Sequence, residues 1–567
     1  MSIRSFNDLR IAPFSALLDS QIGLPDHQGG PDFDNWDYEI ETRHCRYGRS
    51  PIDTKPKPPI KDPEYVKGEF GYIGPCCLHF GHQVADFSMR ILPTLATGFE
   101  GKLIVGTKQS GPSEFHETPT FFRQIISWFD ITSERILLPK ADSIFEKVYI
   151  APQAETIFGP VPSTEHLETL TEHYSKKTYP LKDFEEKSEI VYISRTRIGR
   201  GVFAGEAALE AYMKSIGARI IFPELEDISK LLKIYNDAEY IFGGEGSAFH
   251  LLQFLGSQVK NVVIIRRSAD SNFWGHDFIR CRCKNLQYID AVIGGISGRE
   301  DGRYREEGLA LLDPDSLCKQ LGDILPVNEP MNKTRFEQAE KESLYCWLMN
   351  YWYNSKTFDA SSLDIIISEA RKANILIKSE VIDVARTKYS GTLSDSLKKV
   401  VVERDPSTNL ATYQLRAAVI LGLSGDKIGL NILKDTLEVK NNTWIDYGQV
   451  AQAAYRLSEH EIAHKSVVKA LAGSINQFWL WELQAHILLS MNDLEGAKKS
   501  AMMALSIDSS RPDTLFLLSM TYHRMGNLEL ALLAINAALK ISSKPHFTKL
   551  RLCIENLLNT REDLHHV

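Results

Sequence analysis

The sequence predicts a protein of the α/β class whose C-terminal part is built from α-helices alone. Two observations lead to this prediction. Through residues 66–328, short runs of β-branched and other apolar residues alternate with segments of helical periodicity. Through residues 401–567, small residues return at one fixed interval. The length of 567 residues suits several domains, and 43% hydrophobic with 24% charged residues is the balance of a globular protein.

In the front part, strand-like runs and helical patterns follow one another along the chain. This alternation predicts parallel sheets with helices on both faces. A charged, turn-rich stretch at Ser175–Lys187 divides the elements into two blocks, which predicts two Rossmann-like lobes, 66–175 and 176–328, with a cleft between them. The expected strands are Lys102–Gly106, Arg135–Leu138, Lys147–Ala151, Glu189–Ser194, Arg219–Phe222, Glu239–Gly243 and Asn261–Ile265, and the expected helices are Glu206–Ile216, Ile228–Asn236 and Ser247–Leu255.

Two further segments flank the lobes. Residues 1–65 are rich in Pro, Gly and Asp, which predicts an irregular N-terminal extension. Residues 329–400 predict a helical linker between the lobes and the tail.

The tail, residues 401–567, has the clearest periodicity. Its small residues fall into three columns with a step of 34 residues. Small side chains at such positions let paired helices approach closely, and this period resembles the tetratricopeptide repeat, so we expect an α-helical solenoid. An unrelated helical bundle is the alternative. The columns are Ala463, Ala497 and Ala531; Ala470, Ala504 and Ala538; and Ala417, Ala451, Ala485 and Ser519.

Composition excludes several classes of protein. The net charge of −8 argues against a protein that coats nucleic acid. The eight cysteines lack the spacing of a zinc site, and Cys281 and Cys283 are expected to be free thiols on one strand. The N-terminus does not resemble a secretory signal, and no apolar run is long enough to span a membrane. We therefore expect a cytoplasmic protein, with peripheral binding at the inner membrane face as an option.

A glycine-rich turn follows the expected strand Glu239–Gly243. Gly243, Gly244, Glu245, Gly246 and Ser247 lead directly into a helical pattern. Such a turn suits phosphate, because glycines let backbone N–H groups approach and a helix N-terminus favours negative charge. Ser247 could cap the helix or donate to a phosphate oxygen. Packing alone is the alternative.

Basic residues leave the end of another strand. Arg195 and Arg197 follow Glu189–Ser194 and would face one way if the strand continued. The carboxyl ends of parallel strands border the crevice where α/β proteins bind ligands, and arginine can clamp a diphosphate. A solvated basic turn is the alternative for Arg197.

These residues, in this order, resemble glycosyltransferase family 61 over residues 66–300. The matching segments are Tyr192-Ile193-Ser194-Arg195, Gly205-Glu206, Gly217 before the strand Arg219–Pro223, Gly243–Ala248, and upstream Leu78–Asp86 with Arg90–Pro93. Many members have His where Glu245 stands and Asn where Gly205 stands. The resemblance implies a two-lobed GT-B fold, a nucleotide-sugar donor, with uridine diphosphate favoured as the carrier, inversion at the anomeric carbon, no obligatory metal and no cofactor.

Metal-dependent transferases usually carry Asp-x-Asp at a strand end. Asp32-Phe33-Asp34 and Asp313-Pro314-Asp315 are the two such triplets considered, and both are expected in solvated loops. Without a metal, Arg195 and the Gly243–Ser247 turn must stabilise the leaving diphosphate.

Inverting transfer needs a base that deprotonates the acceptor hydroxyl. His79, His82 and Asp86 recur at i, i+3 and i+7, which would place them on one helix face. Imidazole titrates near neutral pH, and a carboxylate can orient it. We predict His82 as the base and Asp86 as its orienting partner or an alternative base, with His79 as a further candidate. His250 is expected to line the nucleotide pocket or to pack, and Glu245 to accept hydroxyl groups of ribose or sugar or to cap locally.

The sequence thus favours an inverting glycosyltransferase of cell-surface polysaccharide assembly. It would move a sugar to a hydroxyl of a glycan or lipid-linked glycan, and its repeats would bind a protein partner or a second copy. The rival hypothesis is a non-catalytic adaptor with a degenerate nucleotide-sugar-binding domain. A kinase or dehydrogenase is disfavoured, because no Gly-x-x-x-x-Gly-Lys-Ser/Thr run occurs and no convincing Gly-x-Gly-x-x-Gly follows the first strand.

Overall fold

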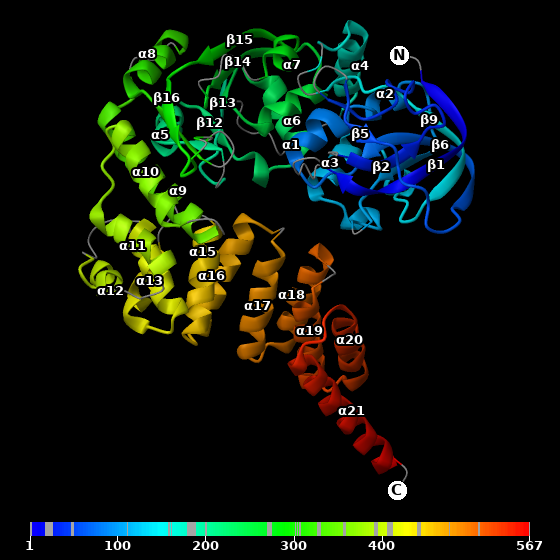
Figure 1. Ribbon diagram of the computed structural model, residues 1–567. Helices are drawn as coiled ribbons and strands as arrows, with labels where there is room; N and C mark the ends of the chain where they lie inside the picture. Colours follow the sequence, from blue (N-terminus) through cyan, green and yellow to red (C-terminus); the bar gives the residue numbers. More distant parts are fainter. Residues whose placement is uncertain are drawn as a thin grey trace. The chain divides into compact units, whose positions relative to one another are not determined.

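The computed structural model divides the chain into two compact units (Figure 1). The first comprises Met1–Gly295 with Arg305–Ala339, and the second comprises Ile296–Tyr304 with Glu340–Val567. The structure describes residues 3–17, 27–46, 50–109, 111–156, 159, 161–177, 189–198, 201–268, 275–300, 302, 304, 308–325, 330–354, 359–390, 395–404, 412–438, 444–475, 477–508 and 511–565. Most of Ser175–Lys187 therefore lies outside the described residues.

A seven-stranded mixed sheet forms the first lobe, with the strand order β5-β2-β1-β9-β6-β7-β8. Strands β9, β6, β7 and β8 run parallel, as predicted, but β1 pairs antiparallel with both β9 and β2. The lobe therefore differs from an all-parallel Rossmann-like block. The strands are β1 Arg4–Leu17, β2 His27–Asp32, β5 Asp53–Thr54, β6 Glu64–Pro75, β7 Lys102–Gly106, β8 Ile136–Leu137 and β9 Ser143–Ile150, and Cys45–Arg46 (β3) pairs with Ser50–Pro51 (β4).

The prediction of an irregular extension at 1–65 is wrong, because β1 and β2 are integral strands of this sheet. Leu9 and Ile11 of β1 are buried against Phe70 and Phe145 of the neighbouring strands. Pro13, which suggested a loop, lies where the register between β1 and β2 shifts, and such an irregularity tolerates a residue without N–H.

Short helical segments cover this sheet. They are α1 Phe80–His82, the π-helical turn η1 Gln83–Phe87, α2 Ile91–Leu95, η2 Phe115–Glu117, α3 Thr120–Trp128, η3 Ser133–Arg135 and α4 Thr164–Ser175.

A five-stranded parallel sheet forms the second lobe, with the order β12-β10-β13-β14-β15. Four of its strands confirm predicted strands to within two residues at each end. They are β10 Ile190–Ile193, β12 Arg219–Ile221, β13 Tyr240–Gly244 and β14 Val259–Ile265, and β15 is Cys283–Ile289. Its helical segments are α5 Glu206–Ser215, η5 Pro223–Leu225, α6 Ile228–Asp237, η6 Ser247–Phe254, α7 His276–Arg280 and α8 Pro314–Ile324, and a small sheet joins β11 Val202–Phe203, β17 Leu309–Leu312 and β16 Val292–Ile296.

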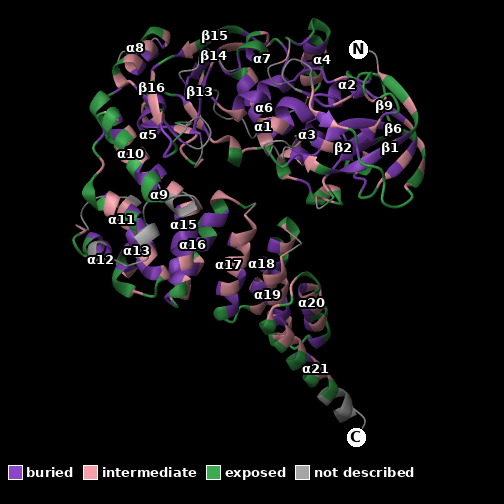
Figure 2. Ribbon diagram, in the orientation of Figure 1, coloured by how far each residue is buried: buried purple, intermediate pink, exposed green. Residues whose placement is uncertain are grey.

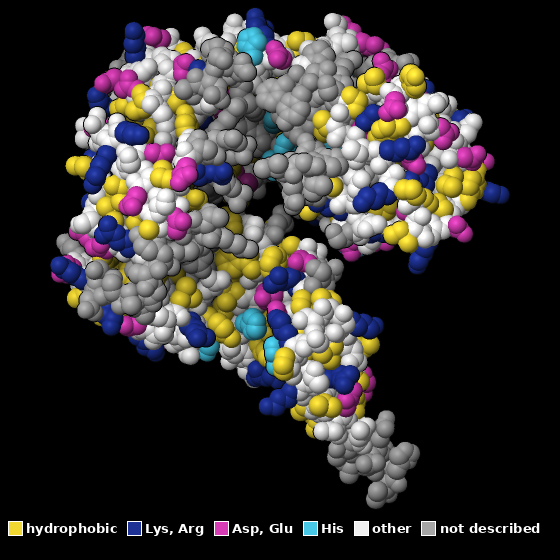
Figure 3. All heavy atoms as spheres, in the orientation of Figure 1, with side chains coloured by type: hydrophobic (Ala, Val, Ile, Leu, Met, Phe, Trp, Pro, Cys, Tyr) yellow, Lys and Arg dark blue, Asp and Glu magenta, His cyan; other side chains and the backbone are white. Residues whose placement is uncertain are grey.

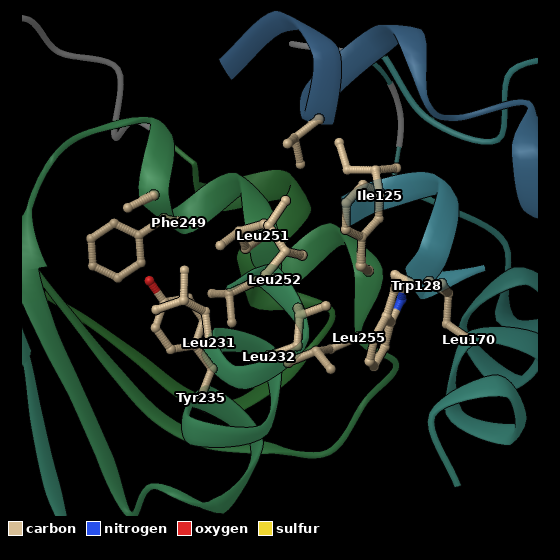
Figure 4. Close-up of a cluster of buried hydrophobic side chains, with 14 of the residues drawn as sticks. Ile125, Trp128, Leu170, Leu231, Leu232, Tyr235, Phe249, Leu251, Leu252 and Leu255 are labelled. Carbon is tan, nitrogen blue, oxygen red and sulfur yellow. The ribbon is translucent and has the colours of Figure 1, made fainter. Parts of the chain in front are cut away.

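One hydrophobic core serves both lobes (Figure 4). Ile125 and Trp128 of α3, from the first lobe, pack with Leu232 of α6 and Leu252 and Leu255 of the second. All five side chains are at most 2% exposed, and burying each contributes about 1.5–3 kcal/mol relative to exposure. The two lobes thus pack against each other through shared apolar side chains. Figure 2 shows the buried residues concentrated in and around both sheets.

The second unit is helical, as predicted for the tail. Helices α15–α16, α17–α18 and α19–α20 form three pairs that carry the columns of small residues, except for Ala417, which lies on α13, and every member of those columns is 0% exposed. The helices are α9 Lys333–Asn354 (shared with the first unit), α10 Ala360–Lys372, α11 Ser379–Ser390, α12 Asp395–Val402, α13 Thr412–Leu423, η7 Lys427–Gly429, α14 Leu430–Asp435, α15 Trp444–Arg456, α16 His460–Gly473, α17 Phe478–Ser490, α18 Leu494–Ile507, α19 Pro512–Arg524, α20 Leu528–Ile541 and α21 Pro545–His565.

The predicted linker 329–400 is helical, but it is not a separate segment. From Glu340 onward it belongs to the same compact unit as the repeats. Among the described residues, no helix combines the length and apolarity needed to cross a bilayer.

Candidate functional site

The carboxyl ends of three neighbouring parallel strands bring the predicted donor residues together. Strands β10, β13 and β14 lie side by side in the five-stranded sheet, so the segments that follow them share one edge. Arg195 follows β10, the glycine turn closes β13, and Arg267 follows β14.

Arg195 lies directly against the glycine turn. Its guanidinium group occupies the space that a β-carbon at Gly246 would need, so a larger residue there would displace the Arg195 side chain. Its Nε donates to the carbonyl of Gly201 at 2.9 Å, and its backbone N–H donates to Glu206 Oε1 at 2.7 Å. The half-buried side chain is thereby held toward the turn, as the sequence predicts.

Arg267 is a second cation at this edge, and sequence reasoning missed it. Its Nε donates to the Glu245 carbonyl at 2.6 Å. A β-carbon built on Gly201 would lie 2.6 Å from Arg267 Nη1 and 3.2 Å from Arg195 Nη2, so the two guanidinium groups flank this glycine. Gly201 has a φ of +60°, which also favours glycine. The rule that selected Arg195, a basic residue at the end of a parallel strand, would have found Arg267 after β14.

Arg197 does not join this pair. The strand ends at Ile193, and a turn closed by the Ile198 N–H to Arg195 carbonyl bond of 2.9 Å separates the two arginines. Arg197 is exposed, and its guanidinium carbon lies 3.9 Å from the centre of the Phe222 ring. The expectation that both arginines face one way is wrong, because the strand does not continue.

The glycine turn continues into a 3-10 helix, Ser247–Phe254, and not into the expected α-helix. Gly246 holds the N-cap position and no side chain caps it, so Ser247 is not the cap. Gly243 and Gly244 are close to Ile193 and Phe203 respectively, where a β-carbon would be crowded. The glycines at these two positions therefore serve close packing.

The side chain of Glu245 makes a structural contact within the protein. Its carboxylate is 3% exposed and accepts the backbone N–H of Arg267 at 3.0 Å. It thus fixes the chain where β14 ends, beside the glycine turn.

His250 lies one helical turn further on and is 4% exposed. Its Nδ1 bonds Gln253 Oε1 at 2.8 Å, and its ring stacks on Phe278 at 4.8 Å between centroids. Burial lowers the pKa of His250 to about 4, although the Gln253 bond and Asp86 oppose this, so the ring is neutral at pH 7.

The segment of His79, His82 and Asp86 brings its three polar residues together, but through a different helix than predicted. His79 caps α1, with its Nδ1 3.5 Å from the His82 backbone N–H, and the two imidazole centroids are 4.6 Å apart. The chain then widens into the π-helical turn Gln83–Phe87, closed by Ser88 N–H to Gln83 carbonyl at 2.9 Å. His82 Nδ1 lies 3.8 Å from Asp86 Oδ2, and the Asp86 side chain is 1% exposed.

Buried amides hold this turn in place. Gln83 Oε1 accepts the Cys77 N–H at 2.7 Å. Gln153, which follows β9, donates from Nε2 to the Asp86 carbonyl at 3.2 Å and accepts the Cys45 N–H at 2.8 Å. These partners come from distant parts of the sequence.

The two halves of the site touch within the first unit. A β-carbon on Gly81 would lie 2.9 Å from Cβ of Ser247, so the histidine segment passes against the glycine turn. Gln253 of η6 also donates from Nε2 to the Ala85 carbonyl at 3.4 Å. The geometry therefore places an imidazole–carboxylate pair next to a cationic, glycine-lined sheet edge.

The two Asp-x-Asp triplets lie at strand ends, contrary to expectation. Asp32 is the last residue of β2 and binds Arg10 at 2.7 Å, and Asp313 follows β17 and caps α8. Asp32 and Asp313 thus each have a structural partner. Within the described residues, no group of three His, Cys, Asp or Glu side chains could hold a metal ion.

Cys281 and Cys283 do not share one strand, because Cys281 is the C-cap of α7 and only Cys283 belongs to β15.

Fold and site together define an α/β protein with a sheet edge suited to anions, followed by helical repeats. The family model Glycosyltransferase 61 matches residues 80–264, and a Tetratricopeptide repeat model matches residues 512–545. These two matches confirm the resemblance stated from the sequence. A search of curated proteins found no match.

Several solved structures resemble the chain over a short stretch. The first TPR of Spaghetti (RPAP3), bound to an HSP90 peptide, is 12% identical, with a TM-score of 0.20, covering 20% of this chain and 93% of that one. MamA 41-end from Desulfovibrio magneticus RS-1 is 18% identical with a TM-score of 0.24, covering 27% and 86%. The Yersinia enterocolitica chaperone SycD is 18% identical with a TM-score of 0.19, covering 23% and 96%. Scores this low carry no argument about function.

Proposed function

We propose that the first unit is an inverting, metal-independent glycosyltransferase. It would move a hexosyl or pentosyl group from a nucleotide sugar, with uridine diphosphate as the favoured carrier, to a hydroxyl of a glycan or lipid-linked glycan. The two lobes would act as a GT-B pair, and the protein would work in cell-surface polysaccharide assembly from the cytoplasmic side.

The observation that carries this proposal is the pair Arg195 and Arg267 beside Gly201 and Gly246. Two guanidinium groups at one sheet edge can take up the charge that develops on a leaving diphosphate. The glycine turn adds backbone N–H groups without side chains that would keep a phosphate at a distance.

His82 and Asp86 supply the second requirement. Nδ1 of His82 faces the Asp86 carboxylate, and we assign Nε2 as the atom that accepts the proton of the acceptor hydroxyl. In the proposed step, the acceptor oxygen forms a bond to the anomeric carbon and gives its proton to Nε2. The bond from that carbon to the diphosphate oxygen breaks, and its electron pair leaves with the diphosphate. Direct displacement of this kind inverts the anomeric configuration.

The decisive experiment measures donor binding and transfer in Arg195→Ala. We expect nucleoside diphosphate affinity and sugar transfer to fall by about 10²-fold or more, because a charge-assisted contact to the leaving group is lost. Arg195→Lys should recover only part, because lysine lacks the planar fork. Arg335→Ala on the exposed surface of α9 is the matched control. Unchanged turnover in Arg195→Ala would reject the phosphate role.

The tetratricopeptide region favours a second candidate, a non-catalytic adaptor that binds a protein partner or a second copy. Calorimetry of the full chain with uridine, guanosine and cytidine diphosphates and their sugars separates the two. An absence of binding at millimolar ligand would favour the adaptor.

A further inference from the structure

A buried carboxylate stands directly behind the phosphate-facing arginine. Glu206 is the first residue of α5 and is 3% exposed. Its Oε1 accepts two hydrogen bonds, from the backbone N–H of Arg195 at 2.7 Å and from the hydroxyl of Tyr192 at 3.2 Å. Burying a carboxylic acid in this position costs free energy, so the two hydrogen bonds that it accepts indicate a specific role.

The surroundings of Glu206 fix where its carboxylate can go. Gly205, with a φ of +85°, starts the helix, and the ring of Phe336 fills the space that a β-carbon there would occupy. Tyr192 lies on β10, and Arg195 follows the end of that strand. The Glu206 carboxylate is therefore held between these two residues. The direction of the main chain at Arg195 therefore depends on the hydrogen bond from its backbone N–H to Glu206 Oε1.

We propose that Glu206 is a positioning residue that holds the main chain of Arg195 in the geometry that points its guanidinium at the glycine turn. This inference rests on the proposed phosphate role of Arg195. The same clamp ties three parts of the donor half together, namely strand β10, helix α5 and the turn at Arg195.

The Glu206 carboxyl group also carries a proton near neutral pH. Burial raises the pKa of Glu206 to about 7, which outweighs the opposing effects of Arg195 and the Tyr192 bond, and Glu210 on the same helix raises it further. Within the described residues, no hydrogen bond reaches Glu206 Oε2, so this oxygen can hold the proton while Oε1 keeps its bonds.

The sign of the coupling follows from charge. An anion bound at Arg195 favours the neutral form of Glu206, so binding should take up protons near pH 7, and affinity should fall as the pH rises through 7. The titratable or charged groups that face Glu206 are Tyr192, Arg195 and Glu210, from β10, the turn after it, and α5 itself.

The test compares Glu206→Gln and Glu206→Ala in the full chain, with uridine diphosphate and inorganic pyrophosphate as probes. The glutamine variant keeps an acceptor oxygen, so it should bind within about threefold of the wild type. The alanine variant leaves the Arg195 N–H without its acceptor and should lose about tenfold or more, with a higher donor KM and an unchanged acceptor KM. Thermal unfolding checks that each variant is folded.

Titration calorimetry in buffers of different ionisation enthalpy then measures proton uptake on binding. We expect wild-type uptake to exceed that of Glu206→Gln by a few tenths of a proton per site at pH 7. Glu168→Gln, at an exposed acid on α4, is the matched control, because Glu168 is not among the groups that face Glu206, and its uptake should equal the wild type.

The outcomes are distinguishable. If the wild type binds neither probe, the proposed function fails. If the wild type binds, Arg195→Ala does not, and Glu206→Ala binds as well as the wild type, the positioning role is overturned. The role is equally overturned if Glu206→Gln binds as poorly as the alanine variant. If the alanine variant does not fold, the binding of Glu206→Gln and its difference in proton uptake decide the matter.

Discussion

The two halves of the candidate site are built in different ways. At the donor half, three parallel strands end side by side, and the residues just beyond those ends form the site. At the acceptor half, the π-helical turn Gln83–Phe87 is held by amides from elsewhere, such as Gln153. The first half is encoded locally, strand by strand, whereas the second depends on partners far away in sequence. Three substitutions test whether the halves also act separately.

The largest effect is expected at the acceptor half, in His82→Ala. Loss of a general base should lower turnover by about 10²–10⁴-fold, while nucleoside diphosphate affinity stays unchanged, because His82 is assigned to the acceptor hydroxyl and not to the diphosphate. Single-turnover kinetics and calorimetry measure the two quantities. His116→Ala, an exposed histidine on η2, is the control. A fall in donor affinity as large as the fall in turnover would show that the halves are not separate.

Arg267→Ala probes the donor half and should cost about 10²-fold in turnover together with weaker diphosphate binding, because one of two cations beside Gly201 is removed. Arg266→Ala is the neighbouring control, since its guanidinium pairs with Asp290 at 2.6 Å. An effect confined to acceptor KM would contradict the assignment of Arg267 to the leaving group.

The smallest effect is expected from Gln153→Ala. The variant loses the bonds to Asp86 and Cys45, at a cost of about 1–3 kcal/mol in the free energy of unfolding. Turnover should fall about tenfold as the π-turn loosens, with donor affinity unchanged. Chemical denaturation and steady-state kinetics measure both, and normal turnover would show that the turn is held adequately without this amide.

The same contrast explains what could be predicted from the sequence. Strands β10, β12, β13 and β14 were predicted closely, because buried parallel strands are continuous apolar runs. Strands β1 and β2 were missed, because the Pro, Gly and Asp content of residues 1–65 suggested an irregular segment. Their strand character comes from pairing with β9, which no local pattern reveals.

The site shows the same division. The spacing of His79, His82 and Asp86 predicted their proximity, but the π-turn that achieves it depends on tertiary hydrogen bonds. Arg195 was predicted from its place after a strand, and Arg267 could have been. The positioning role of Glu206 could not be predicted from the sequence, because it depends on the burial of the carboxylate, which appears only once α5 packs on β10.

The core that both lobes share limits how substrates can enter. Trp128 and Ile125 of one lobe meet Leu252 and Leu255 of the other with almost no exposure to solvent (Figure 4). A hinge motion that parted the lobes would wet these side chains, at roughly 25 cal/mol for each Å² of apolar surface. A hinge motion between the lobes is therefore costly. On the face drawn in Figure 3, hydrophobic side chains are interspersed with charged ones.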